Sequence, residues 1–184
     1  MSVFNPIQPE VADTEAKASL DIVHSAFGGT PNLMKMLANS PNVLKGIMSF
    51  SKEVSSGEIE TSLFEQVALL TSAINNCEYC VAVHFYVGQQ AGLSREELIS
   101  NLQSKASNPR SQAVLNFTRE VVENRGKVDL TTVQDLREHG LSDKAIIEVL
   151  GVIGLYTFLN YAKHLTNPAL DFPAVPEFPV KMPV

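Results

Sequence analysis

The amino-acid sequence predicts an all-α protein, and three observations support this fold class. The 184 residues fall within the usual size of a single domain. Apolar residues make up 45% of the chain and charged residues 18%, which is typical of a protein that buries a core. Between residues 42 and 167 proline occurs only at position 109, and apolar residues recur there at helical spacing. Together these features predict a helical bundle.

The first half of the chain predicts five helices separated by turn residues. Gly28-Gly29-Thr30-Pro31 ends the first helix. Ser40-Pro41 supplies an N-cap followed by proline at the first helical position, and Ser56-Gly57 ends the helix that it opens. Asn75-Asn76 is a tight connection between two antiparallel helices, a helical hairpin. The expected helices cover residues 9 or 11 to 26, 31–39, 41–55, 58–74 and 77–91.

The second half predicts four more helices. Ser94 and Glu97 have the spacing of a capping box, and Gly126 and Gly140 follow helix ends. The expected ranges are 94–102, 109–125, 130–138 and 142–165. The last helix is apolar on nearly every side, so we expect it to be buried, either centrally or at a subunit interface.

We expect one all-α domain over residues 1–167 and a Pro-rich C-terminal strap over residues 168–184. The strap holds five of the ten prolines, together with Phe172 and Phe178. Such spacing is typical of an extended, polyproline-like segment. The sequence leaves two states open for it: a disordered tail, or a segment that docks on its own core or on a neighbouring subunit.

Charge and hydropathy exclude several classes of partner. The formal net charge is −6, which argues against nucleic acid or an anionic membrane as the main partner, because both attract basic surfaces. Residues 1–6 lack the basic stretch and apolar run of a signal peptide. The uncharged run over residues 149–162 is shorter than a membrane span requires. We therefore expect a soluble, cytoplasmic protein.

The only two cysteines, Cys77 and Cys80, are too close in sequence to staple distant segments together. On the helix expected over residues 77–91, Cys77, Cys80 and His84 share one face. Unpaired backbone N–H groups and the helix dipole in the first turn should lower the pKa of the Cys77 thiol. His84 lies four residues beyond Cys80, so we expect its imidazole to reach the Cys80 sulfur.

Glu65 on the preceding helix completes the set. If the hairpin turns at Asn75-Asn76, antiparallel packing places Glu65 and His84 within roughly 3 Å of the same height along the helix pair. A carboxylate facing an imidazole fixes its tautomer and raises its basicity. The pattern predicts a relay in which Glu65 orients His84 and His84 deprotonates Cys80. Such a dithiol can reduce a peroxide through a sulfenic acid that the second cysteine resolves.

This stretch resembles the AhpD-like alkylhydroperoxidases of the carboxymuconolactone decarboxylase superfamily. Their motif is a Glu, eleven residues, and then Cys-x-x-Cys-x-x-x-His, and Glu65, Cys77, Cys80 and His84 match it in every spacing. The segments 26–28, 31–33, 38–41 and 92–94 look like the peroxidase-related branch of the family. The resemblance covers about residues 20–170.

The resemblance implies a thiol peroxidase that reduces alkyl hydroperoxides on an AhpD-like helical bundle. Cys80 would attack the peroxide, and Cys77 would be the more exposed, resolving partner. An external dithiol, either a lipoyl group or a thioredoxin-like protein, would reduce the disulfide, and the chain would assemble as a trimer or hexamer without cofactor or metal. AhpD itself has a histidine just before the later cysteine. This chain has Tyr79 there, a possible hydrogen-bond donor but a poor base, so we expect weaker peroxidase activity.

Other interpretations of the same residues stay open. Cys-x-x-Cys-x-x-x-His with Glu65 supplies four potential zinc ligands, although three of them would lie on one regular helix. A disulfide carrier or redox sensor without real peroxidase activity is a second interpretation of the dithiol, and a third has the two cysteines simply fill the core. A decarboxylase-like enzyme on the same scaffold is a further alternative, against which the cysteine pair counts.

Overall fold

The computed structural model describes residues 4–178, and within this range every regular element is an α-helix. The all-α prediction is therefore confirmed. In chain order the helices are α1 (Thr14–Phe27), α2 (Asn32–Leu37), α3 (Pro41–Ser55), α4 (Thr61–Ile74), α5 (Glu78–Gln90), α6 (Arg95–Asn101), α7 (Pro109–Glu123), α8 (Leu130–Glu138) and α9 (Asp143–Thr166).

The helix starts differ from the expectation where local capping decides them. The first helix begins at Thr14 rather than at residue 9 or 11, because the Asp13 carboxylate accepts a hydrogen bond from the Ala16 backbone N–H at 2.8 Å. Pro41 occupies the first position of α3 as expected, but the Ser40 side chain makes no capping hydrogen bond there. Asn167 ends α9 in the left-handed conformation, with φ of 45°.

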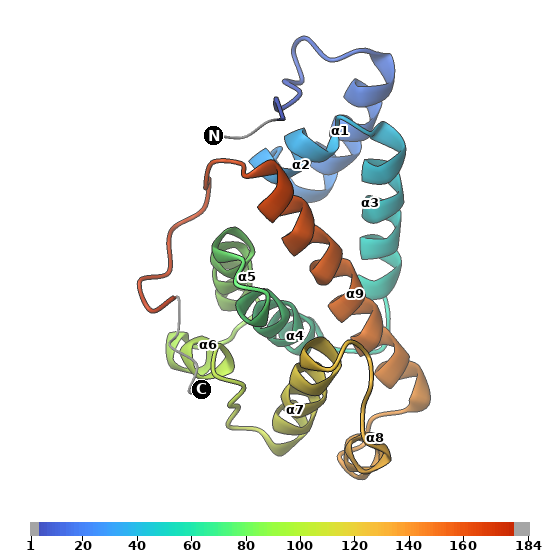
Figure 1. The fold of residues 1–184 in the computed structure, drawn as a ribbon, viewed down its shortest axis with the longest axis vertical. Helices are drawn as coiled ribbons and strands as arrows, with labels where there is room; N and C mark the ends of the chain where they lie inside the picture. The colour runs from blue at the N-terminus through green and yellow to red at the C-terminus, as the bar shows by residue number, and fades with distance from the viewer. Residues whose placement is uncertain (1–3, 179–184) are drawn as a thin grey trace.

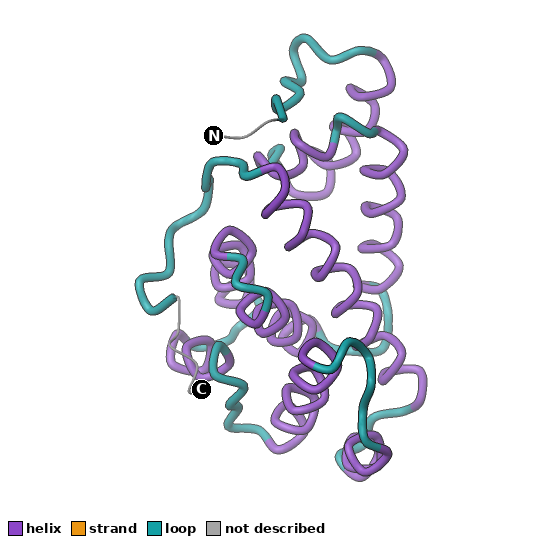
Figure 2. Tube along the Cα trace, in the orientation of Figure 1, coloured by secondary structure: helices purple, strands orange, loops and turns teal. Residues whose placement is uncertain are grey.

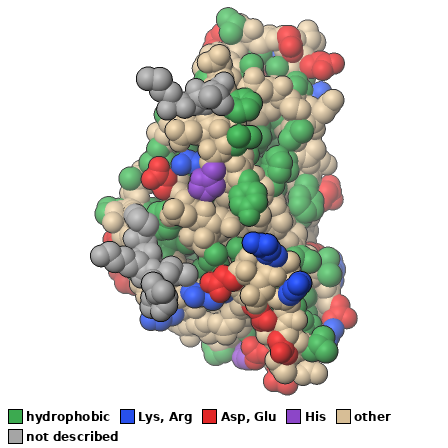
Figure 3. Space-filling view, viewed as in Figure 1, with side chains coloured by type: hydrophobic (Ala, Val, Ile, Leu, Met, Phe, Trp, Pro, Cys, Tyr) green, Lys and Arg blue, Asp and Glu red, His purple; other side chains and the backbone are tan. Residues whose placement is uncertain are grey.

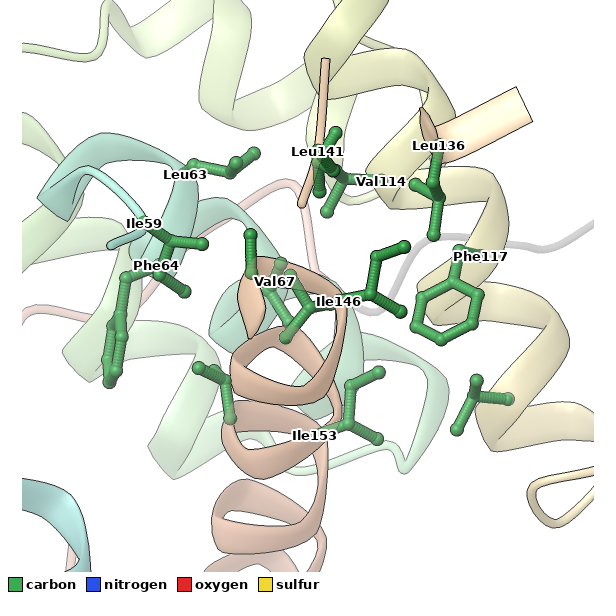
Figure 4. Packing of buried hydrophobic residues seen from close by; sticks show 14 of the residues in the cluster. Ile59, Leu63, Phe64, Val67, Val114, Phe117, Leu136, Leu141, Ile146 and Ile153 are labelled. Carbon is green, nitrogen blue, oxygen red and sulfur yellow. The ribbon is translucent and has the colours of Figure 1, made fainter. Parts of the chain in front are cut away.

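Helix α4 lies at the centre of the bundle. It packs against α5, α7 and α9, while α1 to α3 gather at one end of the molecule and α6 to α8 at the other (Figure 1). Side chains from α4, α7, α8 and α9 interlock in the largest hydrophobic cluster, which includes Val67, Val114, Leu136 and Ile153 (Figure 4). This packing holds α4 in place at the centre of the fold, and α5 is positioned by its contacts with α4.

Helix α9 is buried along one side of the single chain, and the expectation of burial at a subunit interface stays a prediction for its other side. Apolar residues on its other side form an exposed stripe at helical spacing. The exposed stripe consists of Ile147, Leu150, Gly154, Phe158, Tyr161 and Leu165. In Figure 3 apolar side chains gather along the face that α9 crosses.

Among the described helices, α9 is the one that is long and apolar enough to cross a membrane by length and composition. Within its most apolar window 44% of the helix is buried inside the fold, and the core helix of a soluble protein passes the same test. Length and composition therefore do not place α9 in a membrane.

The described part of the strap, residues 168–178, docks on its own chain. It leaves the end of α9 and runs along one side of the bundle to α6 (Figure 2). Phe172 packs on the cluster around the cysteines, and Val175 and Phe178 pack on the cluster formed by α4, α5 and α6. Arg95 and Glu177 form an ion pair at 2.6 Å. Residues 179–184 of the strap lie outside the described residues.

Candidate active site

The turn of the α4–α5 hairpin sets the position of the two cysteines. Asn76 adopts the left-handed conformation, with φ of 54°, which asparagine tolerates better than most residues. The Cys77 backbone N–H then donates to the Ser72 carbonyl at 2.9 Å and closes the turn. Cys77 becomes the N-cap of α5, and its sulfur accepts a hydrogen bond from the Cys80 backbone N–H at 3.4 Å. The local sequence thus fixes Cys77 at a helix N-terminus.

The two cysteines are free thiols in direct contact, with their sulfurs 2.8 Å apart. Cys77 is 0% exposed and Cys80 is 4% exposed. The expectation that Cys77 is the more exposed partner is therefore wrong in the single chain, because the N-cap position turns its sulfur inward under α9. Only Cys80 of the pair lines the adjacent cavity.

The contact between the two sulfurs shifts the pKa values of the two thiols in opposite directions. The hydrogen bond from Cys80 lowers the pKa of the Cys77 thiol against the opposing effect of burial, and the Cys80 backbone N–H and the positive charge of Lys163 lower it further. The same contact, together with burial, raises the pKa of the Cys80 thiol. The first proton of the pair therefore leaves Cys77, in the direction that its helix-terminal position predicts.

Two residues of α9 that the sequence did not single out stand behind the dithiol. The Asn160 amide donates to Ser72 at 3.1 Å and accepts from the Asn75 side chain at 3.0 Å, which ties α9 to the hairpin turn. Lys163 is buried, and its ammonium lies 3.7 Å from the Glu78 carboxylate. The sequence does carry one indication of the Asn160 contacts: an asparagine stands alone in an apolar helix, and a buried amide requires polar partners.

Glu65 and His84 are buried together and joined by a hydrogen bond. The His84 Nδ1 and Glu65 Oε2 atoms are 2.7 Å apart, so the two side chains lie at the common height that the hairpin geometry predicts. Tyr156 packs against the imidazole in an edge-to-face arrangement, with ring centroids 4.2 Å apart. Glu65 and Tyr156 thus fix the orientation of the imidazole from α4 and α9.

His84 does not bond directly to the sulfur of Cys80 as we expected. Within residues 4–178 the hydrogen bond of His84 is made to Glu65, and neither cysteine is its partner. The i, i+4 spacing places both side chains on one face of α5, but Glu65 and Tyr156 hold the ring away from a direct bond. Because both groups line the same cavity, proton exchange between them requires a water or a substrate atom.

Tyr79 lies on the cavity wall next to Cys80. Its hydroxyl accepts a hydrogen bond from the Leu33 backbone N–H at 3.3 Å, and its ring meets Phe172 of the strap edge to face. Burial and the nearby carboxylate of Asp171 raise the pKa of the Tyr79 phenol. Tyr79 therefore remains protonated and cannot take over the role of a base.

A cavity of about 430 Å³ lies over the dithiol, and we call it the thiol cavity. Its reactive side presents Cys80, His84 and Glu65, and most of its remaining lining is apolar or aromatic. This volume falls in the range of small-molecule sites, which are mostly apolar with a few convergent polar groups. The four motif residues thus meet at one site, three of them facing the cavity and Cys77 lying behind Cys80.

For metal binding, the described part of the chain contains no group of three or more His, Cys, Asp or Glu side chains placed to hold an ion. The Glu65 carboxylate and the His84 imidazole form a hydrogen bond with each other, and the two thiols contact each other. The four potential zinc ligands are therefore arranged as two separate pairs.

Comparisons with known proteins agree with this architecture. Residues 41–123 match the carboxymuconolactone decarboxylase family. No curated protein matches the chain in sequence. An uncharacterized peroxidase-related protein from Ralstonia eutropha JMP134, with an alkylhydroperoxidase AhpD core, superposes with a TM-score of 0.81 at 20% identity, over 94% of this chain and 92% of that chain.

Two further solved structures have the same fold. The debrominase Bmp8 superposes with a TM-score of 0.79 at 18% identity, over 93% of each chain. An uncharacterized peroxidase-related protein from Silicibacter sp. TM1040 superposes with a TM-score of 0.76 at 20% identity, over 92% of this chain and 97% of that chain. The fold of this chain is therefore AhpD-like. The match to the carboxymuconolactone decarboxylase family extends over less than half of the 184 residues, and the likeness to the solved structures is one of fold.

Proposed function

We propose that this protein is a thiol peroxidase that reduces organic hydroperoxides with the Cys77/Cys80 dithiol. The observation that carries the proposal is the placement of Cys80. Its sulfur touches Cys77 at 2.8 Å and lines a cavity that the bonded pair of Glu65 and His84 also lines. A nucleophile and a proton donor therefore face one space of substrate size, and the resolving partner lies directly behind the nucleophile.

The reaction begins with proton transfer within the dithiol. Cys77 is the more acidic thiol, and its thiolate takes the proton of Cys80 across their contact. The Cys80 thiolate then attacks the terminal oxygen of the hydroperoxide, and the O–O bond breaks. Protonated His84, stabilised by Glu65, gives its proton to the departing alkoxide, which leaves as an alcohol. Cys80 becomes a sulfenic acid.

Cys77 completes the cycle. His84, now neutral, takes the proton of the Cys77 thiol through a water or through the sulfenic oxygen of Cys80, and the thiolate attacks the sulfur of Cys80. The hydroxyl of the sulfenic acid leaves with that proton as water, and a disulfide forms. The dithiol has given two electrons, and the hydroperoxide has become one alcohol and one water.

An external dithiol must reduce the disulfide again. Because Cys77 is fully buried and Cys80 is reached through the thiol cavity, the attacking thiolate must enter that cavity. This access favours a slender dithiol on a flexible arm, such as a lipoyl group, over the broad surface of a thioredoxin-like protein.

We also propose that the chain forms a homo-oligomer, a trimer or a hexamer. The exposed stripe of α9 supports this assembly, because an apolar band that runs along a whole helix is typical of a protein interface. Light scattering coupled to size exclusion measures the mass directly. A monomeric mass at micromolar concentration would contradict the assembly.

The peroxidase proposal is tested by following peroxide consumption by the reduced protein. Wild type should consume about one equivalent of cumene hydroperoxide per dithiol and form the disulfide. Cys80→Ser should abolish consumption, whereas Cys77→Ser should react once and leave a sulfenic acid that dimedone traps. Full consumption by Cys80→Ser would refute the assignment of the nucleophile. Exchange with small disulfides in the absence of any peroxide consumption would identify a dithiol carrier instead.

Reductive debromination is a second candidate, favoured by the apolar and aromatic lining of the cavity over the dithiol. Bmp8, which shares the fold, is a debrominase that has been captured with 2,3,4-tribromopyrrole. In this chemistry the Cys80 thiolate would take the bromine, the ring carbon would take a proton, and Cys77 would displace bromide to form the disulfide. Bromide release from tribromopyrrole by the reduced protein distinguishes this activity from peroxide reduction.

A further inference from the structure

The thiol cavity has a wall that comes from the far end of the chain. Asp171 and Phe172 of the strap line it together with residues of α5. The ring of Phe172 meets Tyr79 at 6.1 Å between centroids and Tyr86 at 6.2 Å, with interplanar angles of 78° and 58°. These spacings are those of favourable aromatic pairs. Three aromatic rings thus form one continuous surface, which we call the aromatic wall.

Hydrogen bonds on one side of Phe172 hold the wall in place. The Asp171 carboxylate accepts from the Asn32 backbone N–H at 2.7 Å, and the Asn32 side-chain amide donates to the Ala169 carbonyl at 3.2 Å. On the other side, Val175 and Phe178 pack against the cluster formed by α4, α5 and α6. With anchors on both sides, the Phe172 ring is presented to the cavity as a fixed surface.

The charge of the lining restricts the ligand further. The charged carboxylates in it belong to Glu65 and Asp171, and no lysine or arginine occurs among the described lining residues. The one cation that the mechanism uses, protonated His84, is already paired with Glu65, so a carboxylate-bearing ligand would lose its hydration and face two carboxylates in a largely apolar site. The cavity therefore favours a neutral ligand.

The volume fits a ring-bearing molecule. A dry apolar cavity of roughly 150 Å³ is enough to bind benzene. The thiol cavity measures about 430 Å³, so an aromatic ring and its substituents fit beside the reactive groups. Hydrogen peroxide would fill little of this space and would leave the aromatic wall without a contact.

We propose that Phe172 determines the substrate class, and that the thiol cavity takes neutral, ring-bearing organic hydroperoxides. The ring rests on the aromatic wall while the peroxide group reaches Cys80. This inference rests on the proposed peroxidase function. The reaction is the one described there: the hydroperoxide is reduced to its alcohol and one water, and the dithiol is oxidised to a disulfide. Phe172 acts by positioning the substrate and takes no part in the chemical steps.

The kinetic test compares cumene hydroperoxide with hydrogen peroxide as substrates. In Phe172→Ala, the ratio of their kcat/KM values should fall at least about fivefold, because the ring loses its contact surface. Leu170→Ala is the matched control, since Leu170 lies on the same strap, is 40% exposed and is outside the cavity lining, and its ratio should stay within about twofold of wild type. Phe172→Leu keeps apolar bulk without a ring and should give an intermediate ratio. An unchanged ratio in a folded Phe172→Ala variant would overturn the proposal.

A binding measurement separates this inference from the peroxidase activity. Cys80→Ser is titrated by calorimetry with 2-phenyl-2-propanol, the neutral alcohol formed from cumene hydroperoxide, and with 2-hydroxy-2-phenylpropanoate, a carboxylate with the same ring. The alcohol should bind at least about tenfold more tightly, and Phe172→Ala should remove most of that binding. If the alcohol binds but no peroxide is consumed, the proposed function fails and the ligand class stands. Equal binding of the carboxylate, or no loss in Phe172→Ala, would refute the ligand class itself.

Discussion

Replacing Lys163 by methionine should make the dithiol less acidic. Lys163 is buried in α9 behind the hairpin turn, and its positive charge lowers the pKa of the Cys77 thiol. Methionine keeps a long, unbranched side chain and removes only the charge, so the packing of α9 should survive. The change therefore isolates the electrostatic contribution of one residue outside the motif.

The size of the effect follows from two opposing contacts. An opposite charge within roughly 4–6 Å shifts a pKa by about 1–3 units. The ammonium of Lys163 is shared with Glu78, whose carboxylate lies 3.7 Å away on a side chain that is 71% exposed. We therefore expect the pKa of the Cys77 thiol to rise, by less than it would if Lys163 had no other partner.

The assay is the pH dependence of alkylation of the reduced protein by iodoacetamide, with thiolate absorbance at 240 nm as a second measurement. Because the reactive form is the thiolate, the rate rises with pH through the pKa, and a pKa raised by 1 unit lowers the rate about tenfold at any pH well below it. At high pH the alkylation rates of wild type and Lys163→Met should become equal, because both dithiols are then ionised.

Two variants control for charge and for position. Lys163→Arg keeps the charge and should leave the profile close to that of wild type. Lys144→Met removes a lysine from the other end of α9, where Lys144 pairs with Glu58 and Glu148, and should also leave the profile unchanged. If Lys163→Met titrates like wild type, the dithiol does not depend on this charge and the electrostatic reasoning is wrong.

Three further results are expected. Glu78→Gln frees the Lys163 ammonium beside it and should lower the pKa of the Cys77 thiol below that of wild type, measured by the same alkylation profile. Glu65→Gln removes the carboxylate from His84 and should slow peroxide consumption by about tenfold to a hundredfold, below the full contribution typical of a general acid and base. Leu63→Ala, at 1% exposure, should lower the free energy of unfolding by about 3 kcal/mol, measured by urea denaturation.

Each of these results has its own control. Glu58→Gln, far from the dithiol, should leave the alkylation profile as it is. The double variant of Glu65→Gln with His84→Gln should be no slower than His84→Gln alone, because the carboxylate acts through the imidazole; additive losses would contradict that coupling. Leu130→Ala, at 79% exposure, should change stability by less than about 0.5 kcal/mol, and a loss equal to that of Leu63→Ala would contradict the burial assignments.

Much of the fold and part of the site could be predicted from the sequence because they depend on local rules. Helical periodicity and the turn at Asn75-Asn76 predicted the α4–α5 hairpin, and the rise per residue predicted that Glu65 and His84 meet, as their 2.7 Å contact shows. Capping geometry predicted the lowered pKa of Cys77, since the helix terminus lies within the same short segment. Each of these features involves residues within one hairpin.

Other features depend on contacts between distant segments, and these came only from the tertiary structure. The exposure of the two thiols is opposite to the expectation, because Cys77 is buried in one hydrophobic cluster with Leu155 and Leu159 of α9. Likewise, His84 does not bond to Cys80, because Glu65 and Tyr156 hold its ring. Neither restraint on α5 can be deduced from the spacing of residues on α5 alone.

By itself, then, the sequence determined an all-α hairpin that carries a dithiol with a paired glutamate and histidine. It left the surroundings of that dithiol undefined. The tertiary structure decided that Asn160 and Lys163 of α9 lie behind the sulfurs and that Phe172 of the strap walls the cavity in front of them. The physical reason is sequence separation: helical periodicity relates residues within a few turns, whereas the packing of α9 and the strap depends on how the whole chain closes around α4.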